Sequence, residues 1–388
     1  MKPVWWQPPQ LRIGQTSKTE RHATWLELFY DLVFVVTITQ LSHHLSTDLS
    51  LSGILRFVAL FVPIWWAWIG ATFYATRFDT DDVGQRLLTL IQMTAIVVLA
   101  IHVDHGFAEH SAGFALAYAI VRGGIILSYL RAYLHVRVAR ALIRHYVIGF
   151  TIAASLWLIS VFVPIPVRFG FWAVGMLIDI ATPVSAGQLH AKLTPHPAHL
   201  SERFGLFTII VLGESILAVV SSLSEQQWQF ITAITGVFGL SIAFSLGWLY
   251  FDNLSSRAIE AAHTRNRIIP YQVWLYTHLP LVISLTSVGV GVKHIISSQP
   301  EVALSNAERW FICGAIALCF LTLGLLLRTD TISSPRRRAK QRFVGALIAI
   351  AVAIVGQNFL PIAVIGLMAL LCIGQVVLEL SQVEYGAT

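Results

Sequence analysis

Charged side chains are scarce in this sequence of 388 residues, because Asp, Glu, Lys and Arg together make up only 12% of it. Soluble globular proteins typically carry about 25%. With 56% hydrophobic residues and a mean hydropathy of +0.71, the composition excludes a soluble domain and predicts an integral membrane protein. The net charge of +6 therefore does not indicate nucleic-acid binding, since the basic residues stand in loops between apolar runs and set topology.

Motifs of several kinds of chemical site are absent as well. The three cysteines lie within apolar runs and form no CxxC pair, so neither a disulfide framework nor a zinc site is predicted. No HExxH, Ser-His-Asp or paired-aspartate motif occurs, and we therefore expect no enzyme, no metal and no other cofactor. We also expect no cleavable signal peptide, because no small-residue cleavage site accompanies the first apolar run.

Apolar runs long enough to cross a bilayer are abundant, each crossing taking about 20 residues. Basic residues concentrate in alternate loops, so the positive-inside rule places both termini in the cytoplasm. The basic loops 131–144 and 328–342 are predicted to set this topology or to contact anionic lipid headgroups. The sequence thus predicts an all-α polytopic membrane protein with about twelve transmembrane helices. The predicted spans are 24–46, 52–75, 86–103, 111–134, 146–164, 168–188, 204–223, 229–251, 269–291, 309–327, 342–357 and 359–380.

Two of these runs resemble each other. A Glu-Arg dipeptide precedes the span that holds Asp31, and the same dipeptide precedes the span that holds Glu214. Because these are the first and the seventh spans, each copy has six spans, an even number, and both copies insert the same way, which predicts two parallel six-helix repeats. Asp31 and Glu214 are then expected to face each other across a pseudo-two-fold axis. The predicted parts are a cytoplasmic segment 1–23, a first repeat 24–190, a cytoplasmic linker 191–203, a second repeat 204–380 and a cytoplasmic tail 381–388.

Ionisable residues recur near the middle of several spans. An acid at mid-bilayer costs about 2.5–3.5 kcal/mol on insertion scales, so such residues face a protein interior or a water cavity. A proton relay uses these residue types, with Glu214 as carrier, Asp31 as its repeat partner and His278 as relay. Gly213 is expected to admit a close helix approach beside Glu214. Structural ion pairs are the alternative. The five residues are Asp31, Arg122, Asp179, Glu214 and His278, and Arg122 is expected to pair with one of the three acids.

Charged residues also gather at the predicted cytoplasmic ends of the first, second, third and seventh spans. Acidic residues at helix N-termini complement the positive end of the helix dipole. The arginines that head spans one and seven are expected to pair with the carboxylates between spans two and three. This pattern predicts a salt-bridged gate, with a static clasp as the alternative. The residues are Glu20, Arg21, Glu27, Arg77, Asp79, Asp81, Asp82, Arg86, His199, Glu202 and Arg203.

Four motifs together resemble a known family. They are WLELFYDLVFVV with the following His43-His44, RFDTDDVGQRLLTLIQM from Arg77, HLSERFGLFTIIVLGES from His199 and YTHLPL from Tyr276. In this order they resemble the bacterial low-temperature-requirement A family, LtrA, whereas the last hundred residues are similar mainly in hydropathy. The resemblance implies a multi-pass protein of the bacterial cytoplasmic membrane that is linked by name to growth in the cold. It implies no substrate.

Three classes of function fit these features. A proton- or ion-coupled secondary transporter fits the repeat, the midplane acids and the gate, and we favour it. An ion channel with a six-plus-six repeat is the first alternative, because Phe29-Tyr30-Asp31 is distantly similar to the Phe-Ser-Asp of the lysosomal potassium-channel family. A membrane-embedded protein with a lipid-related or structural role in the cold is the second.

Overall fold

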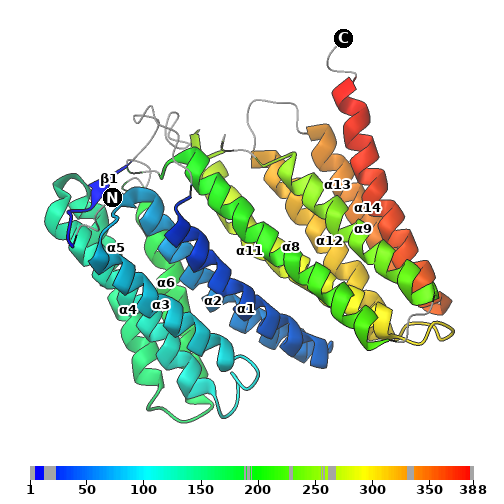
Figure 1. Ribbon diagram of the computed structural model, residues 1–388, viewed down its shortest axis with the longest axis horizontal. Helices are drawn as coiled ribbons and strands as arrows, with labels where there is room; N and C mark the ends of the chain where they lie inside the picture. Colours follow the sequence, from blue (N-terminus) through cyan, green and yellow to red (C-terminus); the bar gives the residue numbers. More distant parts are fainter. Residues whose placement is uncertain are drawn as a thin grey trace. The chain divides into compact units, whose positions relative to one another are not determined.

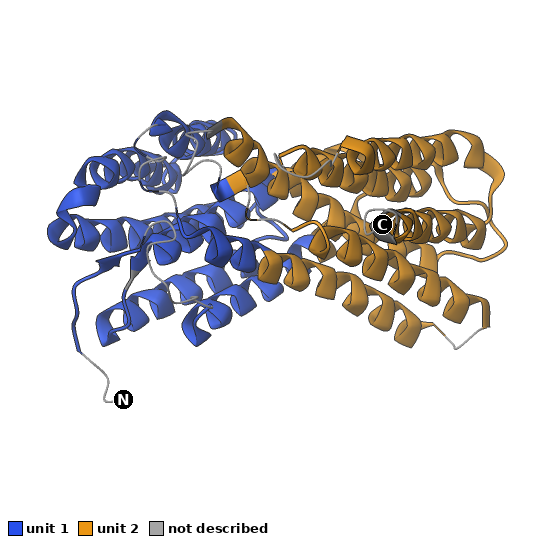
Figure 2. Ribbon diagram, turned by 90° about the horizontal axis from the view of Figure 1, so that it is seen from above, with its two compact units in different colours: residues 1–41, 59–204, 259–268 blue, residues 42–58, 205–258, 269–388 orange. Residues whose placement is uncertain are grey.

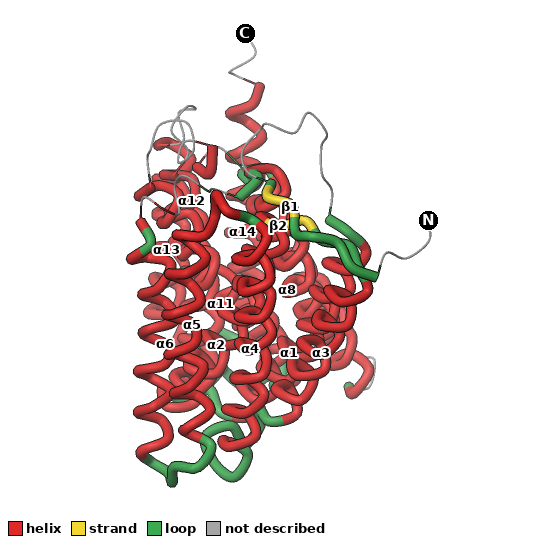
Figure 3. The backbone as a smooth tube through the Cα atoms, turned by 90° about the vertical axis from the view of Figure 1, so that its left-hand side faces the viewer, coloured by secondary structure: helices red, strands yellow, loops and turns green. Residues whose placement is uncertain are grey.

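The computed structural model describes residues 5–12, 23–187, 189, 193, 195–226, 230–254, 256, 258–260, 268–329 and 336–384. This described part is helical apart from one pair of two-residue strands (Figure 3). Twelve of its helices are long and apolar enough to cross a membrane. The predicted all-α polytopic class is thereby confirmed, while the parallel repeat and the cytoplasmic position of both termini stay predictions.

The helices follow the predicted spans in order (Figure 1). Two short 3-10 helices, Arg137–Ala139 and Gly356–Asn358, precede α5 and follow α13. The strands are β1 (Gln10–Leu11) and β2 (Phe78–Asp79). The long helices are α1 (Trp25–Thr47), α2 (Leu51–Arg77), α3 (Val83–Ile101), α4 (Ser111–His135), α5 (Arg140–Ser160), α6 (Val167–Ser185), α8 (Pro197–Glu225), α9 (Phe230–Phe251), α11 (Ile268–Ser297), α12 (Asn306–Thr329), α13 (Arg336–Val355) and α14 (Pro361–Glu384).

The chain divides into two compact units (Figure 2). Unit 1 comprises Met1–Leu41, Ala59–Phe204 and Ile259–Ile268, and unit 2 comprises Ser42–Val58, Gly205–Ala258 and Ile269–Thr388. Helices α3, α4, α5 and α6 belong wholly to unit 1, whereas α9, α12, α13 and α14 belong wholly to unit 2. Helices α1, α2, α8 and α11 contribute residues to both, so each unit contains segments that are distant in the sequence.

In unit 1, helices α3 to α6 pack pairwise in chain order. Aromatic side chains fill the contact between α5 and α6, where the rings of Trp157 and Trp172 stack with centroids 4.9 Å apart. Gly175 faces the same place, because a Cβ there would lie 2.9 Å from the Trp157 ring. The absence of a side chain at this position therefore lets the two helices approach closely.

The strand pair fastens the N-terminal segment to the end of α2. Gln10 pairs with Asp79 and Leu11 with Phe78 in antiparallel register, and Arg12 donates a further backbone hydrogen bond to Arg77. Neither strand is predicted by the sequence pattern, since two residues are too few to show an alternation.

Three helix starts depend on local side-chain chemistry. Thr24 and Glu27 form a capping box, in which each side chain accepts a hydrogen bond from the other's backbone amide. Asp82 caps α3 by accepting from the Gln85 amide at 2.8 Å. Helix α8 opens with Pro197 at its first position, where a missing amide proton costs nothing. Helices α3 and α8 accordingly begin before residues 86 and 204, where their spans were predicted to start. Hydropathy does not detect a first helical turn that is polar.

In unit 2, α12 packs on α13 and α9 packs on α14. The predicted spans 342–357 and 359–380 are two separate helices, α13 and α14. Pro361 begins α14 after the short 3-10 turn, which agrees with the preference of proline for a helix start. Helix α13 extends to Arg336, beyond the apolar stretch that marked its span.

Candidate functional site

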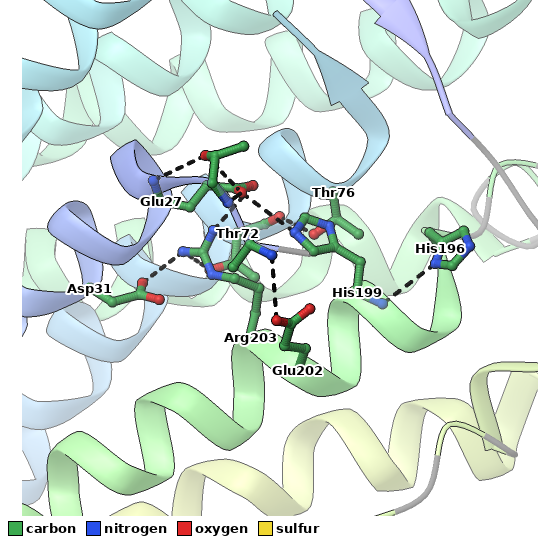
Figure 4. A network of polar contacts seen from close by, with 10 residues as sticks. Glu27, Asp31, Thr72, Thr76, His196, His199, Glu202 and Arg203 are labelled. Carbon is green, nitrogen blue, oxygen red and sulfur yellow. Dashed lines mark hydrogen bonds and ion pairs between the residues drawn. The ribbon is translucent and has the colours of Figure 1, made fainter. Parts of the chain in front are cut away.

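Arg203, in the second turn of α8, lies at the centre of a buried charged cluster in unit 1 (Figure 4). Its side chain is 1% exposed. Its Nη2 atom lies 2.6 Å from Asp31 Oδ1, and its Nη1 atom lies 3.3 Å from Glu27 Oε1. Glu27 and Asp31 are one helical turn apart on α1, so their side chains project from the same face. One guanidinium is therefore shared by two acids.

Asp31 receives its hydrogen bonds on a single oxygen. The Trp68 indole nitrogen on α2 donates to Oδ1 at 2.8 Å, beside the Arg203 donor. The second oxygen, Oδ2, is buried and has no hydrogen-bond partner among the described residues. Arg203 also reaches the hydroxyl of Thr72 on α2 at 3.5 Å. Helices α1, α2 and α8 thus meet at this carboxylate, one oxygen of which remains available to carry a proton.

Glu27 connects the cluster to the start of α1. Its Oε2 atom accepts hydrogen bonds from the backbone amide and the hydroxyl of Thr24, at 2.7 and 3.0 Å. His199 Nε2, one turn before Arg203 on α8, lies 3.5 Å from the same oxygen. The His199 backbone amide in turn donates to the His196 ring at 3.4 Å. The capping box therefore fixes the carboxylate that both α8 side chains face.

Two acids share one arginine in this cluster. Glu27 and Asp31 both contact the guanidinium of Arg203, and His199 faces Glu27 as well. Charge inside a membrane protein is costly. A proton on either acid or on His199 would change the charge of this buried group by one unit.

A cavity of about 320 Å³ in unit 1 reaches this cluster. Glu27 and Arg203 form part of its wall, together with residues from the C-terminal end of α2, the start of α3 and the middle of α4. Its size lies in the range of pockets that bind small molecules. The remaining lining residues are Thr24, Trp25, Leu26, Tyr30, Ala71, Tyr74, Ala75, Phe78, Thr80, Asp81, Gln85, Thr89, Gln92, Ile125 and Ser128.

Arg122 pairs with Asp179, which confirms the prediction of an acidic partner. The Arg122 Nη2 atom lies 2.5 Å from Asp179 Oδ1, and both side chains are 0% exposed. The Tyr118 hydroxyl donates to the other carboxylate oxygen at 2.8 Å, and the guanidinium lies 4.3 Å from the centre of the Phe150 ring. Because one positive charge meets one negative charge, this pair needs no proton to be neutral. Its geometry favours the structural alternative.

Glu214 and His278 belong to unit 2, whereas Asp31, Arg122 and Asp179 belong to unit 1. His278 uses both ring nitrogens, since Nδ1 donates to the Trp274 carbonyl at 2.7 Å and Nε2 lies 3.2 Å from the Tyr250 hydroxyl. A neutral imidazole satisfies both contacts. Glu214 is 8% exposed. The pairing of Glu214 with Asp31 and the relay role of His278 stay predictions.

The close helix approach expected beside Glu214 occurs at another glycine. A Cβ at Gly213 would meet nothing within 4 Å, so the prediction for that residue was wrong. On α11, a Cβ at Gly289 would lie 2.9 Å from the Ser215 hydroxyl oxygen and 3.1 Å from its Cα. The contact therefore forms one residue after Glu214, because in a helix neighbouring positions face directions about 100° apart.

The residues of the predicted gate do not form one network but have different partners. Arg203 was expected to pair with the carboxylates between α2 and α3, but it pairs with the acids of α1. Arg77 is buried, donates to the Leu193 carbonyl at 2.9 Å and lies over the Phe73 ring. Glu202 accepts from the backbone amide of Ala23 at 3.4 Å. Asp79 contributes backbone to the strand pair, and the predicted Glu20 and Arg21 lie outside the described residues.

Asp81 and Asp82 take different partners. Asp81 pairs with Arg86 at 2.7 Å, and both side chains are exposed. Asp82 is buried and pairs with Arg131 of α4. Burial alone would raise the pKa of Asp82, but the hydrogen bonds from Arg131 and from backbone amides hold it below its usual value. The first pair lies at the surface, whereas the second fastens α3 to α4 and, through the Gln7 amide at 2.7 Å, to the N-terminal segment.

Several residues of these sites were missed in the sequence. Trp68 and Thr72 of α2 carry no charge and lie within an apolar run, so no signal marked them as ligands of the buried ions. In unit 2, Arg342 pairs with Glu379 and donates to the Gln375 side chain at 2.7 Å. This pair is buried although both residues stand near the ends of their apolar runs. A search for opposite charges at the start of one span and the end of the next would have found it.

Comparison with known proteins agrees with the architecture. The chain matches the family described as bacterial low temperature requirement A protein (LtrA) over residues 22–378. It is also similar to "Uncharacterized protein RA0937" of Rhizobium meliloti (strain 1021), with 29% identity over 311 residues that cover 76% of this chain and 74% of that protein. The family match continues to residue 378 and so includes most of the last hundred residues, which resembled the family mainly in hydropathy. The chain is therefore a multi-pass membrane protein that belongs to the bacterial LtrA family.

Proposed function

We propose that the protein is a proton-coupled secondary transporter of the bacterial cytoplasmic membrane, with the Glu27–Asp31–Arg203 cluster as its proton-binding centre. The single observation behind this proposal is the sharing of one buried arginine by two acids, with contacts of 2.6 and 3.3 Å. The binding of one proton changes the charge of such a cluster by one unit. Burial makes that change large in free energy, because charge is disfavoured within the membrane.

Asp31 Oδ2 is the atom best placed to take the proton. It is buried and without a hydrogen-bond partner in the described part of the chain, whereas Oδ1 accepts from Arg203 and Trp68. A proton on Oδ2 weakens the attraction between Asp31 and Arg203 and leaves Glu27 as the remaining anion. The strength of the contacts that join α1, α2 and α8 therefore depends on whether Asp31 carries a proton. A ligand or proton shifts a conformational equilibrium by its differential affinity for the two states.

A solute bound in the cavity would lie next to charged residues of the proton-binding cluster. Glu27 and Arg203 belong both to the cluster and to the cavity wall. A bound solute and a bound proton would therefore alter one electrostatic centre, which is the requirement for coupling. The Arg122–Asp179 pair is neutral without a proton, so we assign it to structural support. No catalytic chemistry is included in this proposal.

We propose Glu214 as a second proton-binding acid, because it is buried and because its span, like that of Asp31, follows a Glu-Arg dipeptide. The lipid bilayer remains the expected partner, with anionic headgroups at the basic loops 131–144 and 328–342. The parallel repeat would give the second unit a related acidic centre.

Purified protein in liposomes that contain a pH-sensitive dye provides the test. We expect saturable proton movement that depends on a solute gradient. Asp31→Asn and Glu27→Gln should abolish proton movement while the protein still folds, and Glu109→Gln, in the exposed loop between α3 and α4, should leave it unchanged. Glu214→Gln tests the second acid separately.

Two other outcomes would replace the proposal. Rapid flux that follows voltage and does not saturate would assign an ion channel, because a channel needs no coupled conformational cycle. The absence of flux for every solute and ion, from protein with an unchanged melting curve, would move the function to a lipid-related or structural role. Normal proton coupling in the Asp31→Asn variant would remove the cluster from the mechanism.

A further inference from the structure

The wall of the unit 1 cavity combines aromatic rings with carboxylates. Aromatic faces carry negative electrostatic potential, so they attract cations, and rings arranged around a carboxylate are a common means of binding ammonium groups. An inorganic ion alone would leave most of a 320 Å³ cavity empty. The wall residues with this chemistry are Trp25, Tyr30, Tyr74, Phe78, Glu27 and Asp81.

The positive charges near the cavity are already compensated. The positive charge of Arg203 is already shared by Asp31 and Glu27. Arg86 at the rim is paired with Asp81. The aromatic rings and carboxylates of the wall therefore favour a cationic ligand over an anionic one.

Tyr30 provides an independent pointer to a ligand. Its side chain is 4% exposed and lines the cavity, and its hydroxyl has no hydrogen-bond partner within the described residues. The carbonyl oxygen of the Gln85 side chain, also on the wall, likewise has none there. A buried polar group without a partner is destabilising, so a ligand with its own hydroxyl or amine would be favoured. Glu27 lies one turn from Tyr30 on α1, three residues before it.

At the rim of the cavity an aromatic ring and a carboxylate already bind a cation of the protein itself, the guanidinium of Arg86. The Arg86 guanidinium lies 5.5 Å from the centre of the Trp25 ring while its nitrogen contacts Asp81 at 2.7 Å. Trp25 and Asp81 both line the cavity. One aromatic face and one carboxylate therefore already hold a cation in this structure. The inner set, Tyr30 and Glu27, offers the same pair of groups to a ligand.

We propose that this cavity binds a small organic cation, an amine or quaternary ammonium compound that also carries a hydrogen-bonding group. As the transported solute, this ligand would rest on the transport function proposed above. Its binding, however, is measured without a membrane gradient. Failure of transport and failure of cation recognition are therefore separate results.

Calorimetric titration of the full-length protein in detergent tests the proposal with three matched probes. Choline carries the positive charge and a hydroxyl, 3,3-dimethylbutan-1-ol is its neutral analogue, and 3,3-dimethylbutanoate is an anion of similar shape. We expect saturable binding of choline and binding at least about tenfold weaker for the neutral analogue, since the cation–π and carboxylate contacts are lost. The anion should show no saturable binding.

Variants locate the site. Glu27→Gln should weaken choline binding about tenfold, and Tyr30→Phe, which removes only the hydroxyl, should weaken it less. Tyr133→Phe, outside the cavity lining, and Glu109→Gln are the matched controls and should bind as the parent does. Choline binding that survives both cavity substitutions would place the ligand elsewhere and overturn the proposal.

The other outcomes are also decisive. Equal binding of choline and its neutral analogue would show that charge is not recognised, and preferential binding of the anion would assign recognition to Arg203. Absence of saturable binding for choline, tetramethylammonium and ethanolamine, from protein with an unchanged melting curve, would likewise refute a cation site. If choline binds but no proton movement is found in liposomes, the cation site stands and the transport function fails.

Discussion

Arg203 and Asp31 stand 172 residues apart in the sequence, yet their side chains meet at 2.6 Å and both are about 1% exposed. The contact ties the start of α8 to α1 within unit 1. Because Glu27 approaches the same guanidinium, the arginine serves two acids that lie on one face of α1. The stability of this part of the protein should therefore depend on Arg203 more than on any exposed arginine.

Replacement of Arg203 by leucine should destabilise the protein strongly. Removal of one partner from a buried ion pair typically costs about 3–5 kcal/mol, because the remaining charge stays buried without compensation. Here two carboxylates would remain. Arg86→Leu, whose side chain is 38% exposed, is the matched control and should cost no more than about 1 kcal/mol. Chemical unfolding in detergent measures both, and equal costs would contradict the assignment.

A second substitution distinguishes charge from packing at the same position. Combining Arg203→Leu with Asp31→Asn removes one positive and one negative charge, so the cluster regains its original net charge. We expect the double variant to be more stable than Arg203→Leu alone. If both unfold at the same denaturant concentration, Arg203 contributes through its shape rather than through its charge.

Arg122→Leu should cost a similar amount for a simpler reason. It leaves Asp179 buried with only the Tyr118 hydroxyl as a hydrogen-bond donor. The expected loss is about 3–5 kcal/mol, and the loss should be reduced in a variant that also carries Asp179→Asn. Arg56, which pairs with Asp48 at an exposed position, provides the control. A melting temperature of Arg122→Leu equal to that of Arg56→Leu would show that the buried pair contributes little.

The class of fold was predictable from the sequence because it depends on composition and run length. Twelve apolar runs give twelve helices, since backbone groups in lipid must be paired within a helix. The boundaries at Val83 and Pro197 were not predictable from hydropathy, because capping residues and polar first turns extend both helices beyond their apolar parts. The strand pair at Gln10 and Phe78 depends on a contact between distant segments and has no local signal.

The candidate site was only partly predictable for a related reason. The burial cost of charge identified Asp31 and Arg122 as residues that need compensation, and it named Asp179 among the partners of Arg122. It did not select Arg203 as the partner of Asp31, because Arg203 stood at the edge of a predicted span and was assigned to the gate. The additional turns at the start of α8 bury Arg203, and this change of environment decides its role.

Two adjacent glycines in α4 offer a test of helix packing. A Cβ at Gly124 would lie 2.6 Å from Cγ of Gln92, a cavity-lining residue of α3, whereas a Cβ at Gly123 would meet nothing within 4 Å. Gly124→Ala should therefore shift α3 against α4 and cost about 1–3 kcal/mol. Gly123→Ala should be neutral or should stabilise by up to about 1 kcal/mol through helix propensity. Thermal unfolding of the two variants side by side measures the difference, and equal effects would contradict the close contact.

The last prediction concerns acid sensitivity at Asp82. Its pKa in the folded protein is held below the usual value by hydrogen bonds from Arg131 and from backbone amides, despite the opposing effect of burial. A carboxylate with a lowered pKa stabilises the folded state fully above its unfolded pKa of about 3.9, and this contribution is lost as the pH falls through the folded pKa. Asp82→Asn retains an oxygen for the helix cap, so it removes mainly the charge. We expect the variant to be less stable than the parent by about 1.5–3 kcal/mol at pH 7.

The stability difference should then shrink as the pH is lowered from 5 to below 3, because the parent loses the charge that the variant already lacks. Arg131→Met should show the same convergence with the parent, since it removes the partner of that charge. Unfolding in detergent at a series of pH values measures both variants. A difference that stays constant across this range would mean that the contribution of Asp82 to stability does not depend on its charge.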